Sequence, residues 1–257
     1  MNDKIRLVWS YTPTDFFETT FETDRGPFHF QIQGGEITVS ITDEHVDVDE
    51  AIIRQVYNEL EDIFMGAQIV VHKPFNLPRD HTTYRKRPDG EEDIAVSVSA
   101  STNVFLAAKV DITLTDKNGN VVADTRADRE AKVKKVAELS WKYRRRDDTA
   151  DAILNSYKAA VEDRNNYFIH LYEVIEALVK KFGSNNAVRD VLGISRTQLR
   201  RLHYLANEAP LEENRHRGYH HNELRKAAQD ELEDGRNIAR ALIVSYLEYL
   251  DQNDSST

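Results

Sequence analysis

The chain has 257 residues, of which 40% are hydrophobic and 30% charged, with a formal net charge of -10 and no cysteine. These values exclude a disulfide framework, a cysteine zinc site and a thiolate nucleophile, and the acidic total argues against wrapping of nucleic acid around the whole surface. The sequence has neither a run of 18 apolar residues nor a signal-peptide pattern, so it predicts a cytoplasmic protein that does not enter a membrane.

The first part of the chain alternates apolar and polar residues as β-strands do. Residues 28–32 and 37–41 carry this alternation, and Gly34-Gly35 between them favours the tight turn of a hairpin. A second strand-rich stretch covers residues 93–124, with a turn at Asn118-Gly119. These segments predict an antiparallel or mixed sheet.

Two segments separate these strand-rich stretches. Apolar residues at helical spacing predict one helix within residues 46–64, which Asp47 or Asp49 caps at its start. Residues 73–93 contain three prolines and many charges, which predicts an exposed loop.

After Asp124 the pattern becomes helical, and glycine and proline become rare. Apolar spacing and end signals predict helices over residues 127–146, about 149–182, 185–193, 195–208 and about 222–251. The sequence therefore predicts an α+β protein with a β-rich domain over residues 1–125, an all-α bundle over 126–251 and a disordered tail over 252–257.

Arginine and histidine gather in the stretch LEENRHRGYHHNELRK. Arg215 and His220 form the pattern R-x-x-x-x-H, and His216 directly follows the arginine. A guanidinium matches phosphate oxygens, and an imidazole exchanges a proton near neutral pH. Residues five apart point about 140° away from each other on one helix, so the pair converges only if Gly218 interrupts the helix or two copies meet across a dimer axis.

With this motif between a helical set and a last long helix, residues 127–251 resemble a HEPN domain, whose ribonuclease members carry R-x4-6-H. The resemblance implies a homodimer that forms through the helical domain and cuts RNA in a basic cleft, without metal or cofactor. It also implies a role in toxin–antitoxin pairs, phage defence or RNA processing. By position Arg215 would hold the phosphate, His220 would act as general acid or base, and His216 would orient the site. Arg217 and His221 would contact RNA, and the β domain would bind a protein partner or sense a trigger.

The chain contains other pairs at the same spacings: Arg164–His170, Arg196–His203 and Arg215–His221. Asn165 gives the first pair the polar neighbour that the motif favours. This pair is the main rival, discounted here because the predicted helix of residues 149–182 needs its apolar face for the core.

A second sequence pattern favours the binding of DNA. Residues 186–207 resemble a helix-turn-helix with Gly193 at the turn, and the second helix would present Arg196, Arg200 and Arg201 to a groove. This alternative is a DNA-binding regulator, although two short helices that merely pack in a bundle would have the same pattern. A third interpretation is a non-catalytic adaptor, in which the basic stretch only makes weak surface ion pairs.

No phosphate-binding glycine loop is present, and the sequence indicates no cofactor. Neighbouring histidines diverge by about 100° on a helix, so His220 and His221 do not predict a metal site with Glu223.

Overall fold

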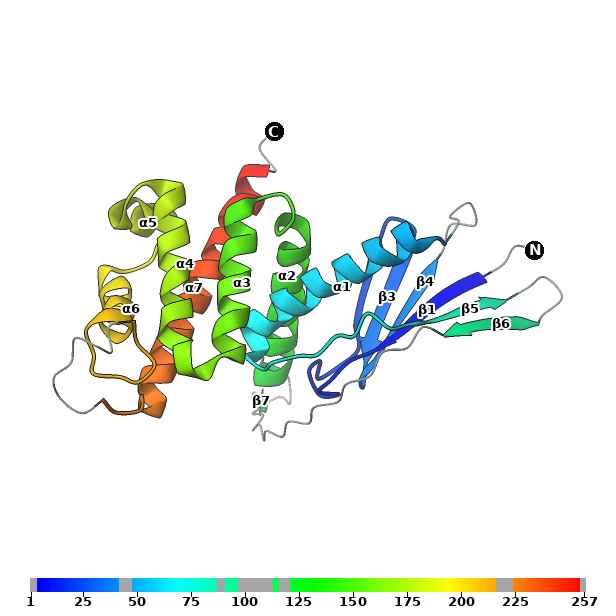
Figure 1. The fold of residues 1–257 in the computed structure, drawn as a ribbon, viewed down its shortest axis with the longest axis horizontal. Helices are drawn as coiled ribbons and strands as arrows, with labels where there is room; N and C mark the ends of the chain where they lie inside the picture. The colour runs from blue at the N-terminus through cyan, green and yellow to red at the C-terminus, as the bar shows by residue number, and fades with distance from the viewer. Residues whose placement is uncertain are drawn as a thin grey trace. The chain divides into compact units, whose positions relative to one another are not determined.

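A computed structural model describes residues 4–41, 48–86, 91–96, 113–115, 121–215 and 224–254 (Figure 1). The chain divides into two compact units, a sheet unit of residues 1–64 and 75–134 and a helical unit of residues 65–74 and 135–257. The predicted α+β fold class, with an N-terminal sheet and a helical C-terminal region, is confirmed. The boundary predicted at residue 125 stays a prediction, because a compact unit is not necessarily a segment that folds alone.

The sheet unit contains a six-stranded antiparallel sheet in the order β2-β3-β4-β1-β5-β6. Its strands are β1 (Lys4–Ser10), β2 (Phe21–Arg25), β3 (Phe28–Gln33), β4 (Glu36–Ile41), β5 (Thr82–Lys86) and β6 (Glu92–Val96). The predicted hairpin is confirmed as β3 and β4, where Gln33 pairs with Glu36. Gly34 and Gly35 between them have φ angles of 60° and 93°, which glycine adopts without steric cost.

Helix α1 (Glu50–Val71) starts after Asp49, whose carboxylate accepts a 2.9 Å hydrogen bond from the Ile52 amide. The predicted cap is therefore Asp49, and the helix continues beyond the predicted range. In the sheet unit the helix crosses one face of the sheet (Figure 1). Alternate strand residues and one stripe of the helix are fully buried and form this core: Leu7, Phe30, Ile32, Ile37, Val39, Val56, Leu60, Ile63 and Phe64.

The prediction of a loop over residues 73–93 is wrong, because this segment contains β5 and the start of β6. Strand β5 contains Thr82, Thr83 and Tyr84, residue types that favour extended backbone, and it pairs with β1. The prolines that suggested a loop include Pro74 and Pro78, which precede the strand. Two short strands, β7 (Thr113–Thr115) and β8 (Val121–Asp124), pair with each other, while most of the predicted stretch over residues 93–124 lies outside the described residues.

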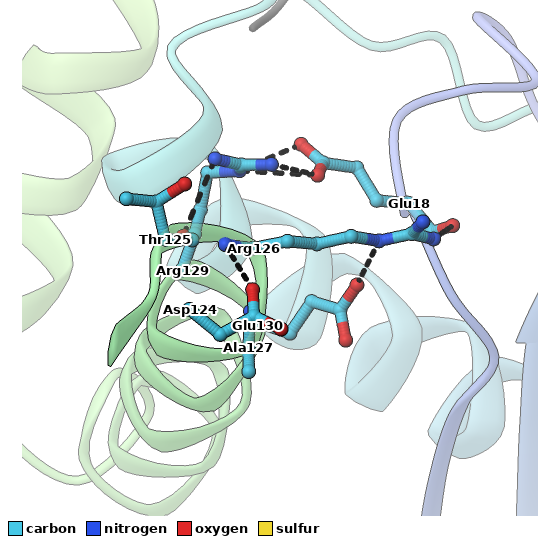
Figure 2. Close-up of polar contacts among 7 residues, drawn as sticks. All are labelled: Glu18, Asp124, Thr125, Arg126, Ala127, Arg129 and Glu130. Carbon is cyan, nitrogen blue, oxygen red and sulfur yellow. Dashed lines mark hydrogen bonds and ion pairs between the residues drawn. The ribbon is translucent and has the colours of Figure 1, made fainter. Parts of the chain in front are cut away.

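Charged side chains fix the start of helix α2 (Thr125–Tyr143) within the sheet unit (Figure 2). The Asp124 carboxylate accepts from the amides of Arg126 and Ala127, at 2.9 and 3.1 Å, and so caps the helix. The Arg129 guanidinium forms a bidentate ion pair with Glu18, and the Arg126 guanidinium donates to the Glu18 backbone carbonyl at 3.2 Å. These partners indicate a structural role for both arginines.

The helical unit contains the second part of α2, α3 (Asp148–Glu162), a 3-10 turn η1 (Arg164–Asn166), α4 (Tyr167–Phe182), α5 (Asn185–Leu192), α6 (Arg196–Asn207) and α7 (Gln229–Asp254). Helices α3, α4 and α7 lie side by side (Figure 1). Their facing residues are buried and form the core of the unit: Ile153, Leu154, Tyr157, Phe168, Leu171, Leu178, Leu242, Ile243 and Tyr246.

The prediction of a single helix over residues 149–182 is wrong, because the helix is interrupted at Asp163. The Asp163 carboxylate accepts from the Asn165 amide at 3.1 Å and from the Asn166 side chain at 2.7 Å. Such local side-chain bonds compete with the helical backbone ladder, which explains the break. The end of the second helix at Gly183 is confirmed, with φ of 91°.

The start predicted for the last helix is also wrong. Leu211 and Arg225 form a parallel bridge, in which the Glu212 amide donates to the Arg225 carbonyl and the Arg225 amide to the Pro210 carbonyl, at 2.9 and 3.0 Å. This extended backbone delays α7 to Gln229. The helix continues to Asp254, so residues 252–254 of the predicted disordered tail are helical, and residues 255–257 lie outside the described residues.

Candidate nucleic-acid interface

Helices α5 and α6 are fixed by strong local signals. The Ser184 hydroxyl accepts from the Ala187 amide at 3.2 Å, and Ser195 with Gln198 forms a capping box at the start of α6. Between the helices Gly193 has φ of 68°, a left-handed angle that favours glycine. Both predicted short helices and the predicted turn are confirmed.

The burial of apolar side chains in α5 and α6 determines which of their other side chains are exposed. Val188, Leu192, Leu199, Leu202 and Leu205 are buried. Because they occupy the inner faces, the arginines of α5 and α6 must lie at the rim or on the surface.

A pocket of about 310 Å³ lies between α4, α5 and α6 in the helical unit. We call it the arginine pocket. Its lining residues are Tyr172 and Ile175 from α4, Asn185, Asn186 and Arg189 from α5, and Arg196, Leu199, Arg200 and His203 from α6. Arginine, histidine and tyrosine here line one concave space, together with the apolar side chains of Ile175 and Leu199.

Two of the three arginines have no side-chain partner among the described residues. Arg189 forms an ion pair with Asp190 at 3.0 Å, whereas Arg196 and Arg200 are exposed and make no hydrogen bond or ion pair within the described part of the chain. An unpaired guanidinium keeps all its donors for an anionic ligand. The pocket therefore has the donors that a phosphate group needs.

His203 is held in a fixed orientation at this pocket. The Tyr172 hydroxyl lies 2.9 Å from its Nδ1 atom, and Glu208 lies 3.3 Å from its Nε2 atom. The side chain is 49% exposed, so a ligand can reach the ring. Burial, and next the nearby carboxylate of Glu176, raise the pKa of Tyr172, so its hydroxyl stays a hydrogen-bond donor at neutral pH.

Arg215 also belongs to this surface. Its guanidinium lies 5.7 Å from the centre of the Tyr172 ring and 2.6 Å from the Glu176 carboxylate, and its amide donates to the Ala206 carbonyl. The structure thus brings Arg215 next to a lining residue of the arginine pocket. Its predicted partners His216, Arg217, His220 and His221 lie outside the described residues.

The other predicted arginines differ in their surroundings. Arg196 and Arg200 share the arginine pocket, but Arg201 does not line it. Arg201 binds Asp234 at 2.9 Å and lies 6.0 Å from the Tyr204 ring. It is therefore already engaged within the helical unit.

The rival pair Arg164–His170 is not brought together in one pocket. His170 contacts Glu173 at 3.2 Å and Asp163 at 3.8 Å, while Arg164 lines a different cavity of the helical unit. The helix predicted around this pair is interrupted at Asp163, and Arg164 lies in η1, directly before α4. The apolar face of α4 is buried in the core as expected, with Phe168 and Leu171 fully enclosed.

The site residues predicted from the sequence do not include Arg189, Tyr172 or His203. His203 had a usable signal, because it follows Arg196 at the R-x6-H spacing and residues seven apart lie within about 20° on one helix face. Tyr172 had none, because only tertiary packing brings α4 beside α6.

The described ranges show neither a metal-binding cluster nor a membrane-spanning helix. They contain no cluster of three or more histidine, cysteine, aspartate or glutamate residues suited to a metal ion. No helix there is long and apolar enough to cross a membrane.

A scan against protein-family models gives no match, and searches of curated proteins and of solved structures give no significant match either. The resemblance to HEPN domains therefore stays a prediction.

Proposed function

We propose that the protein binds single-stranded RNA at the arginine pocket of its helical unit. The observation that carries this proposal is that two unpaired arginines, Arg196 and Arg200, share a concave pocket with Tyr172 and His203. Guanidinium groups bind the phosphates, and aromatic rings stack on unpaired bases, which is the usual combination in single-strand recognition. The net charge of -10 restricts nucleic-acid binding to such a local patch.

Binding is tested by the fluorescence anisotropy of a labelled uridine 12-mer. We expect Arg196→Ala/Arg200→Ala to weaken binding about tenfold or more, because charge-assisted phosphate contacts are lost. The control Lys132→Ala/Lys134→Ala removes two exposed charges from α2 and should change the affinity little. Equal losses in both double variants would show that the affinity comes from general charge, and would reject the pocket.

Metal-independent cleavage is the activity implied by the resemblance, and the same pocket supports it. The ribose 2′-hydroxyl attacks the phosphorus and loses its proton to a base, while the P–O5′ bond breaks and the leaving oxygen receives a proton. In this proposal Arg196 contacts the phosphate, and His203 transfers a proton after its contacts with Tyr172 and Glu208 have broken. The earlier assignment of Arg215, His216 and His220 to this step is the competing proposal.

Cleavage is tested in EDTA on the same RNA, by analysis of the product ends. A wild-type enzyme should leave 2′,3′-cyclic phosphate, and His203→Ala or His220→Ala should abolish the product, which identifies the histidine. Binding without any product would leave an RNA-binding protein and reject the nuclease. Light scattering of the purified chain tests the homodimer that the resemblance implies.

A DNA-binding regulator is the second candidate. Its support is the α5–Gly193–α6 arrangement, which has the left-handed turn and the capped second helix of a helix-turn-helix. Against it, Arg201 is already bound to Asp234. Tighter binding of duplex DNA than of single-stranded RNA, lost in Arg200→Ala, would favour this candidate over the RNA proposal.

A further inference from the structure

A second cavity lies in the helical unit and shares no lining residue with the arginine pocket. It has a volume of about 260 Å³. We call it the α7 cavity, because α7 contributes Gln229, Leu232, Glu233 and Arg236. It is also lined by His72 and Pro74 after α1, by Arg164 of η1 and by Tyr167 at the start of α4.

Arg236 is the most informative residue of this cavity. Its Nε atom is buried, and the side chain makes no hydrogen bond or ion pair with any described residue. An enclosed guanidinium donor without an acceptor costs free energy. A ligand with acceptor oxygens would satisfy this donor.

Arg164 adds a second cation without a partner. It is exposed at the rim and forms no ion pair or hydrogen bond in the described ranges. The cavity also contains one carboxylate, that of Glu233, which accepts a 2.9 Å hydrogen bond from Gln229 and pairs with neither arginine. The two arginines therefore give the cavity an excess of positive charge.

The remaining polar groups of the cavity are neutral. His72 contacts the Tyr157 hydroxyl through Nδ1 at 2.9 Å and the Tyr167 hydroxyl through Nε2 at 3.4 Å. Burial, and then the charges of Arg236 and Arg240, lower the pKa of His72 to about 3. Arg240 itself donates to the carbonyls of Ile69 and Val70 at 2.7 and 3.0 Å, so it is not free for a ligand.

We propose that the α7 cavity binds a small phosphate monoester, with Arg164 and Arg236 on the phosphate and the organic group against the apolar side chains. Two guanidinium groups match the charge and the oxygen geometry of a phosphate dianion. Pro74, Val161 and Leu232 supply apolar surface for the ester group. The volume is near the lower end for ligand pockets, about 300 Å³, which favours a small ester over a nucleotide. This proposal does not depend on RNA binding.

The test is a titration of the full chain with glycerol 3-phosphate at constant ionic strength, followed by calorimetry and by the imidazole NMR signal of His72. Inorganic phosphate and acetate are the comparison ligands. We expect saturable binding of the ester, tighter than of either comparison ligand, and a shifted His72 signal.

Two variants and one control locate the binding. Arg236→Met and Arg164→Met should each lower the affinity for the ester about tenfold or more, because each variant removes one charged partner of the phosphate. Arg164 is exposed, so its variant tests the cavity even if Arg236→Met unfolds. The control Lys132→Ala/Lys134→Ala, which removes two exposed charges outside both pockets, should bind the ester as the wild type does. Absence of saturation, unchanged binding in Arg164→Met, or equal affinity for inorganic phosphate would overturn the proposal.

Discussion

His72 has an unusual backbone angle and an unusual ring environment. It ends α1 with φ of 54°, a left-handed angle that costs free energy for a residue with a β-carbon. Its ring is nevertheless fixed between the hydroxyls of Tyr157 and Tyr167, and Arg236 and Arg240 provide the nearby charge. The folded protein thus keeps this imidazole neutral.

This neutral ring predicts a pH dependence of stability. The pKa of His72 is about 3 in the folded chain and about 6.5 when unfolded, so below pH 6.5 only the unfolded chain takes up this proton. The contribution of His72 to the free energy of unfolding is therefore largest above pH 6.5 and falls as the pH decreases towards 3. Urea unfolding should show that the wild type loses about 1 kcal/mol more than His72→Asn between about pH 7.5 and 5.5.

Asparagine suits this test because it tolerates the left-handed angle and does not titrate in this range. His203→Asn, which changes a half-exposed histidine, serves as the control and should keep the wild-type dependence. If the free energy of unfolding changed equally with pH in the wild type and in His72→Asn, the neutral, buried state of the ring would be contradicted.

At the scale of elements, a glycine determines how α1 and α2 pack in the helical unit. A Cβ atom at Gly66 would lie 2.7 Å from both the Ala137 Cα atom and the Val136 carbonyl oxygen. These are backbone atoms, which cannot rotate away as a side chain can. The close approach of the two helices therefore needs glycine at this position.

Gly66→Ala should destabilise the protein, although alanine favours a helix by about 1 kcal/mol over glycine. Overpacking against backbone costs about 1–3 kcal/mol, so we expect a net loss in thermal unfolding. Gly235→Ala in α7 is the matched comparison, because the three atoms nearest to its Cβ would belong to the side chains of Phe168 and Leu171. A larger loss in Gly235→Ala than in Gly66→Ala would contradict this explanation.

The elements that sequence predicts well are those with local end signals. Helices α5 and α6 have serine caps and Gly193 within a few residues, and the β3–β4 hairpin has its glycine pair. The break at Asp163 was missed because its apolar spacing continues across the interruption. The late start of α7 was missed because the bridge between Leu211 and Arg225 is a tertiary contact.

The same distinction applies to the candidate site. Arg196 and Arg200 follow from residue type and from their place in a capped helix. Tyr172 cannot be selected from spacing, because it reaches the pocket only when α4 packs beside α6. Which arginines are free is also a tertiary property, as the ion pair of Arg201 with Asp234 shows.

At the scale of the whole molecule, the negative net charge opposes binding of nucleic acid over the general surface. The chain carries 44 acidic and 34 basic residues, so attraction of RNA must come from a few local cations. The arginine pocket offers two unpaired arginines from α6 and one paired arginine from α5. The number of phosphates that this site can neutralise is therefore small.

This small number predicts a shallow salt dependence of RNA binding. Two or three phosphate contacts on a single strand give a slope of about -1.5 to -2 for the logarithm of affinity against that of salt concentration. Anisotropy titrations at several KCl concentrations measure the slope, and Arg196→Ala/Arg200→Ala should reduce its magnitude. A slope steeper than about -5 would require an extended basic surface and contradict a local site.

The bridge between Leu211 and Arg225 has a consequence for engineering of the chain. Its two backbone hydrogen bonds hold the ends of the segment between these residues close together. Once the ends are held, doubling the length of such a segment costs only about 0.6 kcal/mol of closure entropy. Lengthening the chain between these two residues should therefore change the free energy of unfolding of the helical unit by only a few tenths of a kcal/mol to about 1 kcal/mol.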